Sequence, residues 1–113
     1  MTRIRSMLLS SARPDRLRDW YLSAFELELG RTPGEGPGYD LLDFGGTFIC
    51  LDSREDVGEK NTEPGRLILN IDVDGRWLAP LEDREGSLFA TAIDPDGNYV
   101  QIIQLSEEHR AKM

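Results

Sequence analysis

The sequence predicts a single small α+β domain, and three observations support this prediction. An apolar first strand is followed by an amphipathic helix, several later segments alternate apolar and polar residues, and Gly45-Gly46 separates two such segments as in a hairpin. A chain of 113 residues with 39% hydrophobic residues is large enough for one compact core.

The first strand is predicted over residues 5–11 and the helix over residues 14–24. Pro14 suits the first helical turn, where its missing N–H loses no hydrogen bond, and Asp15 complements the helix dipole. One helical stripe carries the apolar side chains that are expected to pack on a sheet: Leu17, Trp20, Tyr21 and Ala24.

Residues 25–29 alternate apolar and acidic side chains, which predicts a half-buried strand, and the Pro- and Gly-rich residues 31–38 predict a loop. Two glycines between strands at 39–44 and 47–51 suit the positive φ angles of a tight turn. Residues 53–65 show no periodicity and are predicted to link two modules.

The second half predicts a strand at 67–73, a short helical turn at 77–81, and strands at 87–93 and 99–105. Residues 94–98, Asp-Pro-Asp-Gly-Asn, form the last turn, since Pro presets one turn angle and Gly or Asn tolerates the left-handed one. This order is an approximate duplication of one βαβββ unit, with the second copy shortened. Module 1 spans about 4–52 and module 2 about 66–105, followed by a charged tail, 106–113, that is expected to fray.

Two motifs in this order resemble the glyoxalase/bleomycin-resistance/dioxygenase superfamily, also called the vicinal oxygen chelate superfamily. They are the helical run Leu17-Arg18-Asp19-Trp20-Tyr21 continuing through residues 25–30, and the Asp-Pro-Asp-Gly-Asn turn followed by Tyr99-Val100-Gln101. The resemblance covers roughly residues 5–105. It implies that each module curls into an open half-barrel, that the two form a cleft whose inner face binds the ligand, and that the protein is a homodimer.

The resemblance also allows a test for metal ligands. Metal-dependent members carry His, Glu or Gln on the first and last strands of each unit, positions that correspond here to Ser6, Cys50, Arg66 and Gln101. Ser6 is a poor ligand and the charge of Arg66 opposes a cation, so Cys50 and Gln101 remain as two scattered candidates. The only histidine, His109, falls in the tail. The sequence therefore predicts no metal site, no cofactor and no assigned catalytic residue.

If these four positions face the cleft, the two-residue strand period also turns other residues inward, among them Ser10 and Ile103. The apolar residues among these inward-facing positions either contact a ligand or fill a small core. Trp77 lies either at the cleft mouth or in a dimer contact. The predicted ligand-binding residues are Ser6, Leu8, Phe48, Cys50, Arg66, Ile68, Asn70, Tyr99, Gln101 and Trp77.

Two of these residues have a specific alternative. An inward Arg66 needs a partner, either an acidic neighbour such as Asp52 or Asp72 or an anionic group of the ligand. Cys50 is interpreted as an inert buried thiol, since no histidine lies near it in sequence to lower its pKa.

The predicted function is metal-independent binding of a small molecule, such as an antibiotic or aromatic metabolite, by a cytoplasmic homodimer. The alternatives are a metal-dependent lyase or dioxygenase with an atypical ligand set, and a non-catalytic structural or regulatory domain. A net charge of −8 argues against a nucleic-acid partner, and no apolar stretch is long enough for a signal peptide or a membrane span.

Overall fold

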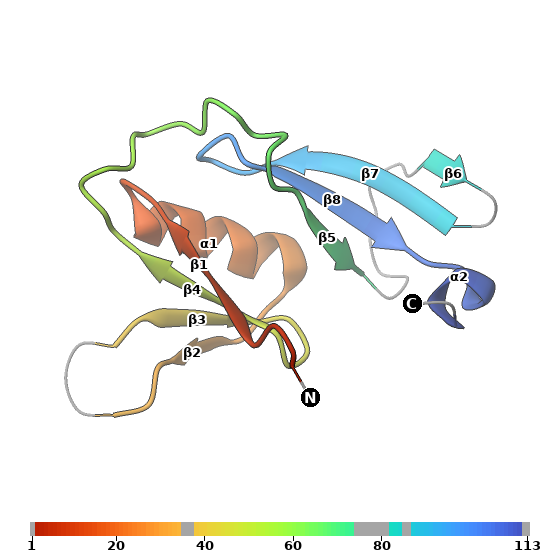
Figure 1. Cartoon of the computed structure of the whole chain (residues 1–113), viewed down its shortest axis with the longest axis horizontal. Coiled ribbons are helices and arrows are strands. Elements are labelled where there is room, and N and C mark those ends of the chain that lie inside the picture. The colour runs from red at the N-terminus through yellow and green to blue at the C-terminus, as the bar shows by residue number, and fades with distance from the viewer. Residues whose placement is uncertain (1, 35–37, 74–81, 85–86, 112–113) are drawn as a thin grey trace. The chain divides into compact units, whose positions relative to one another are not determined.

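The structure is a computed structural model that describes residues 2–34, 38–73, 82–84 and 87–111 (Figure 1). The chain divides into two compact units, Met1–Asn61 and Thr62–Met113. The division falls within residues 53–65, the segment expected to link the modules.

The first unit is a four-stranded sheet, called sheet 1, with one helix packed on it. Its strands lie in the order β1-β4-β3-β2, and β1 pairs with β4 in parallel while the other neighbours are antiparallel. The elements of this unit are β1 (Ser6–Ser10), α1 (Pro14–Phe25), β2 (Leu29–Arg31), β3 (Asp40–Asp43) and β4 (Phe48–Asp52).

The second unit repeats this strand order in sheet 2, β5-β8-β7-β6, again with its first and last strands parallel. The repeat confirms the predicted α+β fold of duplicated modules. The predicted helical turn at 77–81 lies outside the described residues. The described elements of this unit are β5 (Leu69–Asp72), β6 (Glu82–Arg84), β7 (Ser87–Ile93), β8 (Tyr99–Gln104) and α2 (Glu107–Ala111).

The strand predicted over residues 25–29 is wrong. Phe25 is the last residue of α1, and Glu26 ends the helix in the left-handed conformation with φ 52°. The Phe25 ring stacks on the Tyr21 ring at 6.1 Å and meets the Phe44 ring edge-on at 6.1 Å. Packing of these rings therefore outweighs the local alternation of apolar and acidic residues, and β2 starts only at Leu29.

Two short elements of the second unit were not predicted. Strand β6 is made of Glu82, Asp83 and Arg84, which show no apolar alternation, and its pairing with β7 gives sheet 2 a fourth strand. The tail expected to fray contains α2, whose first turn carries Glu107 and Glu108, where negative charge complements the helix dipole. Both elements thus depend on contacts and charges that hydrophobic periodicity does not report.

The core of the first unit lies between α1 and sheet 1. The stripe predicted on the helix is confirmed at its centre, since Leu17 and Tyr21 are fully buried. From the sheet, Leu42, Ile49 and Leu51 are buried as well, and α1 contacts β3 and β4, the strands that carry them. This face of sheet 1 is therefore the helix side.

The hairpin between β3 and β4 is confirmed. Gly45 and Gly46 both have positive φ angles, 79° and 107°, and the N–H groups of both donate to Asp43 Oδ1 at 3.0 Å. The Phe44 N–H donates to the Thr47 carbonyl at 2.9 Å, which closes the turn.

Replacing Gly46 with alanine is expected to lower the free energy of unfolding by about 1–2 kcal/mol, because a Cβ atom disfavours a positive φ. The added Cβ would have open space around it, so the cost comes from the backbone alone. Urea denaturation measures the effect, with Gly58→Ala as the control: Gly58 also has open space but no positive φ. Equal stability of the two variants would contradict the turn geometry.

Candidate ligand-binding site

Four of the predicted site residues lie side by side on β1 and β4. Ser6 pairs with Phe48, and Leu8 pairs with Cys50. On β4, Ile49 and Leu51 alternate with Phe48 and Cys50 and are buried against α1. The four predicted site residues therefore point to the opposite face of sheet 1. This face is called here the open face of sheet 1. Leu8 is 53% exposed on it, and Phe48 and Cys50 are half-buried.

Three predicted residues share one face of sheet 2. Asn70 pairs with Gln101 across β5 and β8, and Tyr99 lies two residues before Gln101. On β8, Val100 and Ile102 alternate with Tyr99 and Gln101 and are buried. By contrast, Asn70 and Tyr99 are exposed and Gln101 is half-buried. The strand period therefore brings these three polar side chains to the less buried face.

The other predicted positions fall differently. Ile68 is exposed and directly precedes β5, while Ile103 is buried. Trp77 lies outside the described residues, and His109 falls in α2. Among the described residues, no three His, Cys, Asp or Glu side chains group as metal ligands would.

Arg66 does not occupy a strand position. It lies in the turn before β5, and its exposed guanidinium donates to Glu63 Oε2, with Nη2 at 3.1 Å. An ion pair was one of the predicted alternatives, but its partner is Glu63 rather than Asp52 or Asp72. Asp52 instead accepts a hydrogen bond from the Ser10 hydroxyl on β1.

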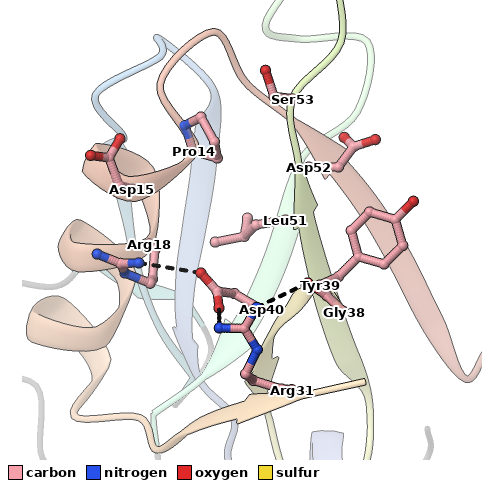
Figure 2. A pocket seen from close by; sticks show the side chains of 10 residues that line it. All are labelled: Pro14, Asp15, Arg18, Arg31, Gly38, Tyr39, Asp40, Leu51, Asp52 and Ser53. Atoms are coloured by element: carbon pink, nitrogen blue, oxygen red, sulfur yellow. Dashed lines mark hydrogen bonds and ion pairs between the residues drawn. The ribbon is translucent and has the colours of Figure 1, made fainter. Parts of the chain in front are cut away.

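The helix side of sheet 1 contains a concavity that the sequence analysis missed (Figure 2). It has a volume of about 360 Å³ and lies wholly within the first unit, between the first half of α1 and the strands of sheet 1. We call it the α1 pocket. Its lining residues are Pro14, Asp15, Arg18, Arg31, Gly38, Tyr39, Asp40, Leu51, Asp52 and Ser53.

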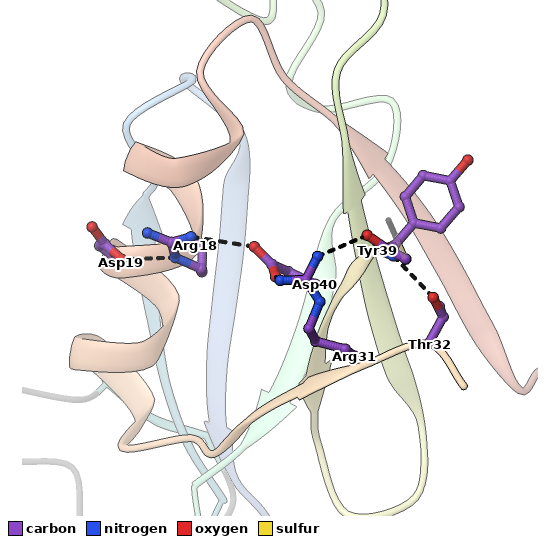
Figure 3. A network of polar contacts seen from close by, with 7 residues as sticks. Arg18, Asp19, Arg31, Thr32, Tyr39 and Asp40 are labelled. Carbon is purple, nitrogen blue, oxygen red and sulfur yellow. Dashed lines mark hydrogen bonds and ion pairs between the residues drawn. The ribbon is translucent and has the colours of Figure 1, made fainter. Parts of the chain in front are cut away.

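A charged bridge links three elements in the α1 pocket (Figure 3). Asp40 on β3 accepts a hydrogen bond from Arg18 Nη1 on α1 at 3.3 Å, and its other oxygen lies 3.6 Å from Arg31 Nη1 on β2. Arg18 Nε also donates to Asp19 at 2.9 Å, and Arg31 Nη2 donates to the Gly38 carbonyl at 3.1 Å. The hydrogen bonds to Asp19 and then to Asp40 raise the pKa of Arg18 above its usual value, so this guanidinium stays charged.

A sequence signal for this pocket does exist. Asp40 is in phase with the fully buried Leu42 on β3, so a carboxylate falls on the helix side of the sheet and requires a cationic partner. Arg18 lies outside the apolar stripe predicted on the helix, and its pairing with Asp40 was not predicted.

The strand order and pairing agree with the fold that the resemblance to the glyoxalase/bleomycin-resistance superfamily implies. No protein-family model matches the sequence, and neither does any curated protein. Solved structures do match across nearly the whole chain. The fosfomycin resistance protein FosX from Mesorhizobium loti is 11% identical over 98% of both chains, with a TM-score of 0.67.

Two further structures show the same likeness. TnmS3, an antibiotic-binding protein from Streptomyces sp. CB03234, is 17% identical over 94% of this chain and 98% of its own, with a TM-score of 0.61. The oxidase ChaP-H2 is 13% identical over 93% of this chain and 94% of its own, with a TM-score of 0.65. At these identities the likeness establishes the fold, and the predicted resemblance to the superfamily is confirmed at that level. No helix in the described part of the chain is long and apolar enough to cross a membrane.

Proposed function

We propose that this chain is a metal-independent small-molecule-binding protein of the glyoxalase/bleomycin-resistance type, which sequesters an antibiotic or aromatic metabolite as a homodimer. The observation that carries the proposal is the open face of sheet 1. Ser6, Leu8, Phe48 and Cys50 lie together there, at the strand pair where metal-dependent members carry two of their ligands. None of the four side chains is an imidazole or a carboxylate.

The chemistry of these residues suits an uncharged, partly aromatic ligand. An exposed leucine and a half-buried phenyl ring supply apolar contact area, and the Ser6 hydroxyl can orient a ligand by hydrogen bonding. In the second unit, the paired amides of Asn70 and Gln101 offer donors and acceptors of the same kind. Similar structures that bind an antibiotic or confer resistance to one support this ligand class for the present chain.

A thermal-shift screen tests the proposal, because a ligand that binds only the folded state raises its melting temperature. The panel contains antibiotics, aromatic metabolites and divalent metal ions, and elemental analysis of the purified protein is run beside it. We expect an organic ligand to raise the melting temperature without added metal. A stoichiometric, tightly bound metal would overturn the metal-independent reading, and light scattering of the same sample tests the homodimer.

Replacing Leu8 with glutamine is expected to weaken binding of the ligand found in that screen by about tenfold. The substitution removes apolar contact area worth about 1.5–3 kcal/mol when a leucine is fully buried, and 1.4 kcal/mol is a factor of ten. Isothermal titration calorimetry measures the change. Leu29→Gln is the matched control, because Leu29 is a similarly exposed leucine, at 47%, but pairs with Leu42 on the helix side. Equal losses in both variants would exclude the open face as the site.

A further inference from the structure

We infer that the α1 pocket is a second binding site, for a small zwitterion of the α-amino acid class. The pocket lies on the helix side of sheet 1. Its lining residues Asp40 and Leu51 are paired across β3 and β4, and their side chains point to the same face as the buried Leu42. The open face of sheet 1 is on the opposite side. This site therefore goes beyond the proposed function and does not depend on it.

The positive part of the pocket suits a carboxylate. Arg18 and Arg31 approach Asp40 from α1 and β2, and each binds a different oxygen of it (Figure 2). Each guanidinium carries five N–H donors, and among the described residues only two contacts are seen for each: Arg18 with Asp40 and Asp19, and Arg31 with Asp40 and Gly38. A ligand carboxylate beside Asp40 would receive charge-assisted hydrogen bonds from the remaining donors.

The negative part of the pocket suits an ammonium group. Asp15, in the first turn of α1, lines the pocket and has no ion pair or hydrogen bond with any described residue. The carboxylate of Asp52 points to the open face, where it accepts the hydrogen bond of Ser10. The other charged side chains of the lining are two arginines and two aspartates. A bare anion would leave Asp15 without a partner and a bare cation would leave the spare guanidinium donors without one, whereas a zwitterion has a partner for each of its charges.

The size and burial of the pocket agree with a small ligand. Its volume of about 360 Å³ lies at the lower end of the range for small-molecule sites, about 300–1,000 Å³. Pro14 and Leu51 add apolar surface for a short aliphatic side chain. Arg18 and Asp40 are only partly exposed, so their interactions with a ligand are screened less by water than those of surface charges.

Three related probes separate the two charges of the ligand: L-valine, N-acetyl-L-valine, which lacks the ammonium group, and L-valine methyl ester, which lacks the carboxylate. Binding is followed by amide chemical shifts of the isotope-labelled full chain. We expect L-valine to shift amides of residues that line the α1 pocket, and each derivative to bind at least tenfold more weakly. Equal binding of L-valine and either derivative overturns the inference, as does the absence of pocket shifts with L-valine at millimolar concentration.

Replacing Arg31 with glutamine is expected to weaken L-valine binding by about tenfold, because a charged donor to the carboxylate is lost. Arg31 is an exposed residue of edge strand β2, so the variant should fold. Arg54→Gln is the matched control, since Arg54 is an exposed arginine that pairs with Asp56 at 3.0 Å and is not one of the residues that line the pocket.

The same titration with Leu8→Gln separates the two sites. Because Leu8 lies on the open face, this variant should bind L-valine like the parent chain even if it loses the organic ligand of the screen. An unchanged affinity in Arg31→Gln, or an equal loss in Arg54→Gln, would exclude the α1 pocket as the zwitterion site.

Discussion

Replacing Tyr21 with alanine is expected to lower the free energy of unfolding by about 3–5 kcal/mol, the range for removing a large buried aromatic side chain. Tyr21 is fully buried, and its ring lies 4.8 Å from the Trp20 ring and 6.1 Å from the Phe25 ring. The truncation leaves a cavity between α1 and sheet 1 that these neighbours can fill only in part. Urea denaturation monitored by circular dichroism measures the loss.

Tyr39→Ala provides the control with the same change of side chain. Tyr39 is 49% exposed, and surface substitutions of this kind usually change stability by no more than about 0.5 kcal/mol. Similar stabilities of the two variants would contradict the placement of Tyr21 at the centre of the first unit's core.

Replacing Asp94 with alanine is expected to lower the free energy of unfolding by about 2–4 kcal/mol, since several donors around a buried carboxylate lose their acceptor. Asp94 is only 3% exposed. Its Oδ1 accepts from the N–H groups of Asp96 and Asn98 at 2.9 and 3.0 Å, and its Oδ2 accepts from Asn98 Nδ2 at 2.8 Å. Chemical denaturation measures the change, and Asp94→Asn should recover part of it because the amide keeps one acceptor oxygen.

Asp43→Ala is the control for this prediction. Asp43 accepts two backbone N–H groups in the turn between β3 and β4, but these hydrogen bonds are exposed, so water can replace them. We expect a loss below about 1 kcal/mol. Equal losses in the free energy of unfolding for Asp94→Ala and Asp43→Ala would contradict the inference that burial of Asp94 causes the larger loss.

The parts of the fold that the sequence predicted are those with a local physical cause. Pro14 begins α1 as expected, and Gly45 and Gly46 adopt the positive φ angles that their turn requires. The Asp94 turn likewise depends on hydrogen bonds within five consecutive residues. By contrast, the end of α1 at Phe25 depends on ring packing with Phe44, a residue distant in sequence.

The site could be predicted from the sequence only in part, for the same reason. The two-residue period of a strand correctly grouped Ser6 with Phe48 and Asn70 with Gln101, because each pair follows from strand register. The period fails for Arg66, which lies before its strand begins. The α1 pocket required Arg18, Arg31 and Asp40 to meet from three elements, and no local pattern reports such a meeting.

The pairing of the first and last strands within each unit affects the order in which the chain can fold during synthesis. Ser10 and Asp52, hydrogen-bonded neighbours on β1 and β4, are separated by 42 residues, so β1 emerges from the ribosome long before its partner exists. Until β4 is available, the apolar stripe of α1 is exposed and the backbone groups of β1 that pair with β4 have no partner strand. Such exposed apolar surface and unpaired strand edges favour chaperone binding or aggregation of the nascent chain. Because unit 1 contains its own last strand, its sheet can be completed before synthesis of sheet 2 is complete.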